Sequence, residues 1–332
     1  MTPHGRIISA VDAGCLDSIQ MERLEHAFRA WAEEPKRADL RLSRKRILLI
    51  FLLVRYTGAK LHEVLALNPA RAPDSENCVI AFENREVQIP PHAAQAMRDL
   101  WLVPRRVTID PAFVRRKFYE RAVACGFSKK QGSPEMIRKA RAVELMQGNL
   151  PVPAVQRVLG HSSPHLTTAR IAFSEDEIRR VTRMHMERES GRKTSARNSF
   201  FGKVHSLIAG DVQTLVQLVT ADGGMLSAIV TNTSAENLGL KPGLLLSAEI
   251  KAPWLVLERR DAEGRNSLEN RRDGVITRIK AGTVNTECAV RIADGTQLCA
   301  VVSSPVFAGL GLKEGDPARV LFSCYAVILH TE

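Results

Sequence analysis

The C-terminal part of the chain contains two similar stretches, ADGGMLSAIVTNTSAENLGLKPG at residues 221–243 and ADGTQLCAVVSSPVFAGLGLKEG at residues 293–315. The similarity extends outward, because residues 195–257 align with residues 267–329 at a constant offset of 72, without a gap and with at least 19 identities. Such self-similarity indicates an internal duplication. In both copies apolar β-branched residues alternate with polar ones and Gly recurs at turns, which is typical of strands. The sequence predicts two small β barrels, at 195–262 and 263–332.

The N-terminal part has a different pattern. Apolar residues recur at helical spacing in five segments, and a polar stretch at 175–194 is expected to form a helix and linker. The five segments are 16–31, 44–54, 110–125, 134–146 and 153–159. Two β-prone runs, 78–82 and 86–89, flank a polar turn and predict a hairpin. The expected fold class is therefore multidomain: a mainly α domain with a small hairpin at 1–185, a linker at 186–194, and all-β tandem barrels.

The net charge of +11 belongs to the N-terminal part. Residues 1–194 hold 33 Lys and Arg against 22 Asp and Glu, whereas residues 195–332 hold 14 of each. Within residues 101–141, 11 basic residues stand against three acidic ones. This concentration favours a nucleic-acid partner for the N-terminal part. A merely solvated basic surface is the alternative.

Composition excludes several classes of protein. No stretch approaches the roughly 18 apolar residues of a membrane helix, and the first residues lack the apolar core of a signal peptide. The six cysteines form no CxxC motif and no Cys/His ligand spacing, so we expect a reduced, cytoplasmic protein without a metal site. The absence of a GxxxxGK[ST] loop excludes an ATP-hydrolysing transporter subunit.

The first repeat carries groups suited to a tetrahedral oxyanion. A dianion removed from water needs two positive charges and several hydroxyl or backbone N–H donors. Arg197 and Lys251 can supply the charge, although two solvated surface cations are the alternative. The complete candidate set is Ser195, Ala196, Arg197, Thr231, Ser234 and Lys251.

Three short motifs carry a resemblance: SARN at 195–198, TNTS at 231–234 and IKA at 250–252. They resemble the molybdate-binding Mop (TOBE-type) domains, here in the tandem arrangement of the ModE family of molybdate-responsive regulators. The resemblance implies that the six candidate residues bind molybdate or tungstate as an effector, with no catalytic cofactor. In that family the site lies between Mop units of two chains. A homodimer is therefore implied, in which Thr231 and Ser234 act on the partner's ligand.

The second repeat departs from this pattern where the chemistry matters. Glu269 stands in place of Arg197, Ser323 in place of Lys251, and Val306 in place of Ser234. A carboxylate repels a dianion. The second repeat is therefore predicted to be a structural copy, with a second equivalent site as the alternative.

The N-terminal part also carries a resemblance. YTGAKLHEVLAL at 56–67 is similar to the first signature box of tyrosine recombinases (phage integrases). SPEMIR at 133–138 and LGHSS at 159–163, followed by Thr167 and Thr168, are similar to the second box. The resemblance covers about residues 16–185, and it implies the fold of the recombinase catalytic domain, whose hairpin falls at 78–89.

The residues that cut DNA in that family are mostly replaced. The family attacks phosphate with a tyrosine while arginines stabilise the transition state. The tyrosine position holds Ile171, a box-one arginine position holds Lys60, and a second-box histidine position holds Glu135, so that Arg138 and His161 are the remnants. Isoleucine forms no phosphotyrosyl bond, so we expect no catalytic residue and no enzyme. A working recombinase is the alternative.

Loss of the nucleophile leaves phosphate contacts by cations intact. For any one basic residue a solvated charge is the alternative, and the argument rests on the group. The candidates for DNA binding are Lys60, Arg115, Arg116, Lys117, Lys129, Lys130, Arg138, Lys139, Arg141 and His161.

Together the two parts resemble the TunR-like family of tungstate-responsive transcription regulators. The resemblance implies a cytoplasmic homodimer that binds double-stranded operator DNA, responds to tungstate or molybdate, and controls genes of their uptake or homeostasis, with no membrane partner. A cytoplasmic oxyanion storage or buffering protein with a relic DNA-binding domain is the alternative. The sequence does not separate tungstate from molybdate, and it gives neither the operator nor the sign of regulation.

Overall fold

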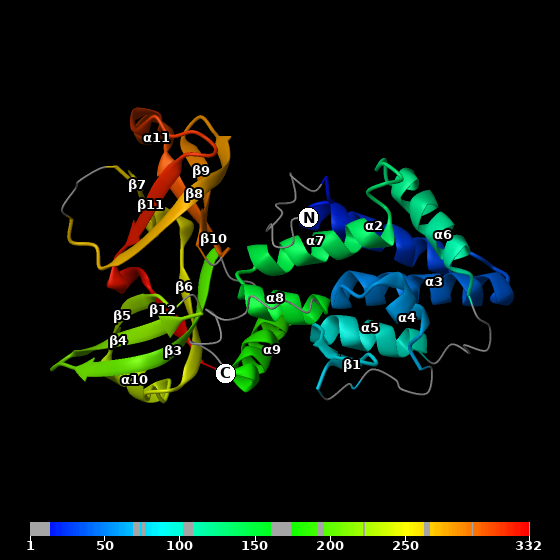
Figure 1. Cartoon of the computed structure of the whole chain (residues 1–332), viewed down its shortest axis with the longest axis horizontal. Coiled ribbons are helices and arrows are strands. Elements are labelled where there is room, and N and C mark those ends of the chain that lie inside the picture. The colour runs from blue at the N-terminus through cyan, green and yellow to red at the C-terminus, as the bar shows by residue number, and fades with distance from the viewer. Residues whose placement is uncertain are drawn as a thin grey trace, which may run out of the picture. The chain divides into compact units, whose positions relative to one another are not determined.

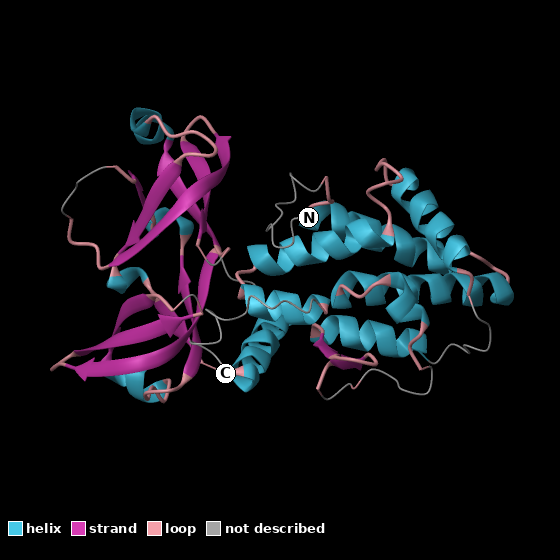
Figure 2. Cartoon of the chain, in the orientation of Figure 1, coloured by secondary structure: helices cyan, strands magenta, loops and turns pink. Residues whose placement is uncertain are grey.

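The computed structural model describes residues 14–68, 74, 77–101, 109–160, 174–191, 196–221, 223–261, 266–293 and 295–331. The chain divides into two compact units. The first contains the described residues of Met1–Leu145, Val155–Ser162 and His185–Arg192, and the second those of Met146–Ala154, Ser163–Met184 and Lys193–Glu332. Helices dominate the N-terminal part and strands the C-terminal part (Figure 2), which confirms the predicted fold class.

The described residues of the N-terminal part form helices and a hairpin (Figure 1). The helices are α2 (Ser18–Glu33), α3 (Ala38–Thr57), α4 (Leu61–Leu65), α5 (Pro91–Trp101), α6 (Pro111–Ala124), α7 (Pro134–Gln147), α8 (Val152–Leu159) and α9 (Glu175–Gly191), and the hairpin pairs β1 (Val79–Ala81) with β2 (Glu86–Gln88). The five predicted helical segments and the hairpin are confirmed. Helices α4 and α5 were not predicted, and α9 includes residues 186–191 of the predicted linker.

Aromatic packing holds α2, α3 and α6 together. Phe28 stacks on Phe51 with ring centroids 4.1 Å apart, and Phe118 meets both rings edge-on. All three side chains are fully buried, and such aromatic pairs add to the free energy of burial. Helix α3 ends at Gly58, whose φ of 61° favours glycine. A Cβ at Gly58 would lie 2.5 Å from Leu159 Cδ2, so this residue also allows close packing within the unit.

None of the helices in the described ranges combines the length and apolarity that a membrane crossing requires. Helix α3 has the longest buried run, Ile47–Thr57, and this run is covered by the other helices of the unit.

The two C-terminal repeats contain the same elements in the same order. Repeat 1 comprises β3 (Asn198–Ala209), β4 (Gln213–Thr220), β5 (Met225–Thr231), α10 (Asn232–Asn237), β6 (Leu245–Ile250), η2 (Ala252–Trp254) and β7 (Val256–Arg259). Repeat 2 comprises β8 (Asn270–Ala281), β9 (Asn285–Ile292), β10 (Gln297–Ser303), α11 (Ser304–Leu310), β11 (Pro317–Phe322), η3 (Cys324–Ala326) and β12 (Ile328–His330). The predicted duplication is therefore a structural one.

The last strand of each repeat pairs with a strand of the other repeat. The two five-stranded antiparallel sheets have the orders β12-β6-β3-β4-β5 and β10-β9-β8-β11-β7. Strand β12 pairs with β6 of repeat 1, and β7 pairs with β11 of repeat 2. The predicted barrels are consequently not independent of each other, since each sheet needs a strand from the opposite repeat.

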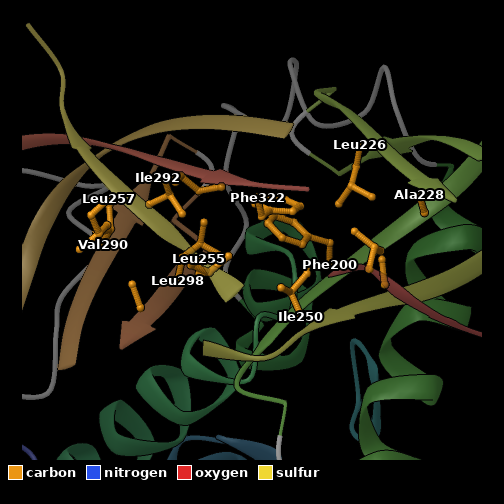
Figure 3. Packing of buried hydrophobic residues seen from close by; sticks show 14 of the residues in the cluster. Phe200, Leu226, Ala228, Ile250, Leu255, Leu257, Val290, Ile292, Leu298 and Phe322 are labelled. Carbon is orange, nitrogen blue, oxygen red and sulfur yellow. The ribbon is translucent and has the colours of Figure 1, made fainter. Parts of the chain in front are cut away.

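One hydrophobic core serves both repeats (Figure 3). Labelled side chains of repeat 1, including Phe200 and Ile250, gather with Ile292, Leu298 and Phe322 of repeat 2. The rings of Phe200 and Phe322 stack with centroids 6.1 Å apart. Burial of apolar surface is the main stabilising contribution, and here it joins the two copies.

Two buried asparagines, one in each repeat, form hydrogen bonds with the backbone of the other repeat. The Asn198 side chain accepts a hydrogen bond from Cys299 N at 2.6 Å and donates to Cys299 O at 3.0 Å. At the equivalent place in repeat 2, Asn270 accepts from Ser227 N at 2.8 Å and donates to Ser227 O at 2.9 Å. Cys299 and Ser227 lie on the edge strands β10 and β5. The side-chain amides thus form hydrogen bonds with backbone N–H and C=O groups that would otherwise be unpaired on an edge strand.

Candidate functional site

The two cations predicted for the oxyanion lie at the same end of repeat 1. Strands β3 and β6 pair up to Asn198 opposite Ile250, and Arg197 and Lys251 are the next residues along these two strands. Lys251 is exposed and precedes η2, while 57% of the Arg197 side chain is exposed. Ala196 is described and half-buried, whereas Ser195 lies outside the described residues.

The predicted hydroxyl pair lies at the opposite end of the same sheet. Thr231 caps α10: its Oγ1 accepts from Ser234 N at 3.1 Å and donates to Ser234 Oγ at 2.8 Å. Thr231 pairs with Gln213, beside the C-terminal end of β3. The 12 residues of β3 therefore separate the hydroxyls from Arg197. At the usual rise per residue this separation is about 40 Å along the strand.

One chain thus brings together the cations but not the complete set of six residues. The predicted set of residues would therefore be completed by the cationic end of one repeat and the hydroxyl end of another. This separation agrees with a site between two chains, which stays a prediction.

The Arg197 guanidinium reaches from repeat 1 to repeat 2. Its Nη1 forms an ion pair with Glu287 Oε2 on β9 and lies 3.9 Å from Cys299 Sγ. Hydrogen bonds to Cys299 and Glu287 raise the pKa of Arg197. The other oxygen of Glu287 accepts from Arg278 Nη2 at 2.7 Å. One carboxylate therefore bridges two arginines, one from each repeat.

At the equivalent place in repeat 2 a carboxylate takes the position of the cation. Glu269 Oε2 accepts from the backbone N–H of Cys324 at 2.9 Å, at the start of η3. This hydrogen bond lowers the pKa of the Glu269 carboxyl. The side chain thus keeps a negative charge where repeat 1 has a positive one, which supports the prediction that repeat 2 is a structural copy.

Sequence reasoning missed Asn198, Asn270 and Glu287. The asparagines are identical at equivalent positions, which was an available signal. Glu287 is equivalent to Leu215 of repeat 1, so a charge on an otherwise matching strand was a signal as well.

Six of the ten predicted DNA-binding residues are exposed. The exposed ones lie on α6, on the segment between α6 and α7, on α7 and before α4; they are Lys60, Arg115, Arg116, Lys129, Lys130 and Lys139. Lys117 is half-buried and pairs with Glu120 at 2.7 Å, and Lys139 pairs with Glu135 at 3.2 Å. The exposed residues remain candidates for phosphate contacts.

Two of the predicted arginines form contacts inside the helical unit. Arg141 is 1% exposed and binds the Glu189 carboxylate through hydrogen bonds of 2.8 and 2.9 Å. The prediction that Arg141 contacts DNA was therefore wrong, because its guanidinium is buried and neutralised. Arg138 is half-buried and donates to Gly58 O at 2.7 Å and to Leu159 O at 2.8 Å. Burial lowers the pKa of Arg138.

The first signature box is also organised by an internal ion pair. Arg85, in the turn of the hairpin, pairs with Glu63 of α4, and Lys60 N donates to Glu63 Oε2 at 2.6 Å. Burial opposes ionisation, but the hydrogen bonds from Arg85 and Lys60 outweigh it and lower the pKa of Glu63. Glu63 therefore makes a structural contact between α4 and the hairpin. His161 and Ile171 lie outside the described residues.

Comparison with known proteins finds a domain family that matches the two C-terminal repeats. The model of the TOBE domain family matches residues 194–257 and again residues 266–329. Each C-terminal repeat matches the TOBE domain. The boundaries of both matches lie close to those of the two structural repeats, and we refer to them below as TOBE repeats.

Two curated proteins are similar over the TOBE repeats. The molybdenum-pterin-binding protein MopA of Rhodobacter capsulatus is 36% identical over 137 residues, which cover 41% of this chain and 52% of MopA. The DNA-binding transcriptional dual regulator ModE of Escherichia coli K12 is 34% identical over 140 residues, which cover 42% of this chain and 52% of ModE. The chain thus spans about half the length of the curated relatives it matches.

A solved structure is similar to this chain at lower identity. The XerH site-specific recombinase bound to difH substrate is 20% identical, with a TM-score of 0.39, over 47% of this chain and 49% of XerH.

Proposed function

We propose that this protein is a transcription regulator that binds DNA through its N-terminal helical unit and senses molybdate or tungstate through its TOBE repeats. The observation that carries the proposal is the pair of cations, Arg197 and Lys251, at one end of a TOBE repeat. A tetrahedral dianion is the ligand that two such charges and additional hydroxyl donors suit best. The similarity to MopA, a molybdenum-pterin-binding protein, supports a molybdenum-containing ligand, and the similarity to ModE, a DNA-binding transcriptional regulator, supports a role in transcription.

The complete site combines two chains. Arg197 and Lys251 bind the oxyanion from one protomer, together with the Ser195 hydroxyl and the backbone N–H groups of Ala196 and Arg197. Thr231 and Ser234 of the partner supply further hydroxyl donors. Support comes from the length of β3, which keeps the two groups apart within one chain. A homodimer then carries two equivalent sites, both using repeat 1.

The helical unit binds DNA without cutting it. The exposed cations on α6 and α7 and on the segment between them contact phosphates. Ile171 stands where the recombinase resemblance places the tyrosine nucleophile. A suicide-substrate assay that trapped a covalent protein–DNA adduct would contradict this proposal.

Calorimetric titration tests the sensor. We expect molybdate and tungstate to bind at one equivalent per chain, sulfate to bind far more weakly, and Arg197→Ala to lose at least tenfold in affinity because a charge-assisted contact is removed. Lys313→Ala, an exposed cation of repeat 2, is the matched control and should bind like the wild type. Two equivalents per chain would show that repeat 2 also binds.

An oxyanion storage protein is the second candidate, since MopA is a molybdenum-pterin-binding protein. The two candidates differ in their response to DNA. A gel shift with genomic fragments, with and without molybdate, decides between them: oxyanion-dependent retardation supports the regulator, and no retardation supports storage.

A further inference from the structure

We infer that Glu287 of repeat 2 sets the oxyanion affinity of the site in repeat 1 by competing with the ligand for Arg197. The inference rests on the proposed function and adds a residue that belongs to the opposite repeat. Glu287 forms an ion pair with Arg197, and it accepts from Arg278 Nη2 at 2.7 Å. A dianion and this carboxylate require the same guanidinium.

The position of the contact is fixed by backbone interactions. Asn198 follows Arg197 directly and holds the backbone of Cys299 on β10 through two hydrogen bonds. Strand β10 pairs with β9 so that Glu287 lies opposite Val301, two residues beyond Cys299. Arg197 is therefore placed beside Glu287 by the junction of the two repeats. The side chain of Glu287 is 19% exposed, which limits the solvent available to screen its charge.

The bridge is specific to this junction. The residues of repeat 1 equivalent to Glu287 and Arg278 are Leu215 and Ser206, and neither is charged. The ion pair is thus not required by the fold that both repeats share. It occurs where repeat 2 meets the repeat that carries the cationic pair.

Charge balance gives the direction of the effect. A dianion that approaches Arg197 meets the negative charge of Glu287 at close range, and this repulsion weakens binding. When Arg197 turns to the ligand, Arg278 remains as the partner of Glu287, so the carboxylate is not left unpaired. Replacing Glu287 by glutamine removes the competition and keeps the size of the side chain.

The test is calorimetric titration of the full-length wild type, Glu287→Gln and Asp273→Asn with molybdate. Asp273 is a matched control, because its carboxylate also bridges two arginines of the module, Arg319 at 2.8 Å and Arg260 at 3.7 Å, and its loss changes the net charge equally. We expect Glu287→Gln to bind molybdate about tenfold more tightly and Asp273→Asn to bind like the wild type.

A second variant removes Arg278, the other arginine that binds Glu287. Arg278→Ala leaves Glu287 with Arg197 alone, so the affinity for molybdate should fall several-fold. If the wild type binds and Glu287→Gln binds equally or more weakly, the inference is wrong and the proposed function stands. If neither protein binds molybdate or tungstate, the proposed function and this inference both fail.

Discussion

The Arg141 side chain is a buried cation that pairs with carboxylates of the helical unit. Its guanidinium is 1% exposed, binds Glu189 of α9 through two hydrogen bonds and lies 3.6 Å from Glu144. Taking such a charge out of water is costly, and paired carboxylates offset the cost. Glu189 and Arg141 lie 48 residues apart in the chain, so this contact connects α9 to α7 within the helical unit.

The Glu189 carboxylate is expected to make the stability of the helical unit depend on pH. Burial alone raises its pKa, but the charge and hydrogen bonds of Arg141 outweigh burial and lower the pKa to about 2. A lowered pKa means that the contribution to stability is present above the unfolded value of about 4.5 and is lost as the pH falls toward about 2. We expect Glu189→Gln to destabilise the unit at pH 7 by about 2 to 3 kcal/mol and to flatten the pH dependence below 4.5.

Denaturant unfolding followed by far-ultraviolet circular dichroism, at pH 7 and at pH 3.5, measures both effects. Glu135→Gln is the control, since its ion pair with Lys139 is exposed and should contribute less than about 1 kcal/mol. Equal losses of stability at both pH values in Glu189→Gln would show that the ion pair is not the titrating contact.

At the scale of elements, the exchange of β7 and β12 predicts that the TOBE repeats unfold cooperatively. Strand β12 contributes Leu329, 5% exposed, to the shared core, while its neighbour Ile328 is 46% exposed. The strand belongs to repeat 2 by sequence and to the sheet of repeat 1 by hydrogen bonding. A destabilising substitution in β12 should therefore also destabilise repeat 1.

Leu329→Ala tests this coupling. Removing a buried leucine side chain costs about 2 to 5 kcal/mol, and we expect amide hydrogen exchange to accelerate in β6 and β3 of repeat 1 as well as in repeat 2. Ile328→Ala is the control on the same strand and should change exchange little. Acceleration confined to β8–β11 in Leu329→Ala would mean that the repeats open separately.

The sequence predicted the strands of the repeats but not the partner of each strand. Alternation of apolar and polar residues indicates which residues lie in a strand, whereas the choice between two equivalent sheets depends on contacts that the pattern does not contain. Helix α5 was missed although Ala93, Met97 and Trp101 recur at helical spacing, because Pro90 and Pro91 look like a break. Pro91 is the first helical residue, where its missing N–H has no partner to lose.

Those residues of the candidate site that lie in short sequence motifs were predictable. Arg197, Lys251, Thr231 and Ser234 follow from short motifs, and the structure places them at the two ends of one sheet. Glu287 was not predictable in this way because it meets Arg197 across 90 residues of sequence. The same holds for the burial of Arg141, which depends on a carboxylate of another helix.

For the whole molecule, the net charge and the proposed oxyanion site are divided between the two parts of the chain. All of the net charge of +11 lies in residues 1–194, whereas residues 195–332 are neutral. Phosphate contacts make DNA affinity fall with salt, with a slope set by the number of cations that touch phosphate. Substitutions on the basic surface should therefore change DNA binding and leave oxyanion binding unaltered.

The double variant Lys129→Ala, Lys130→Ala tests this division, because both residues are exposed on the segment between α6 and α7. We expect weaker DNA binding, a salt slope smaller by about two, and unchanged molybdate titration. Lys241→Ala with Lys313→Ala removes the same charge from exposed positions of the TOBE repeats and should leave the slope as it is. An equal loss of slope in both double variants would mean that net charge, rather than a surface of the helical unit, governs DNA binding. If the basic variant also lost molybdate affinity, the two functions would share a surface, contrary to the division that the charge distribution predicts.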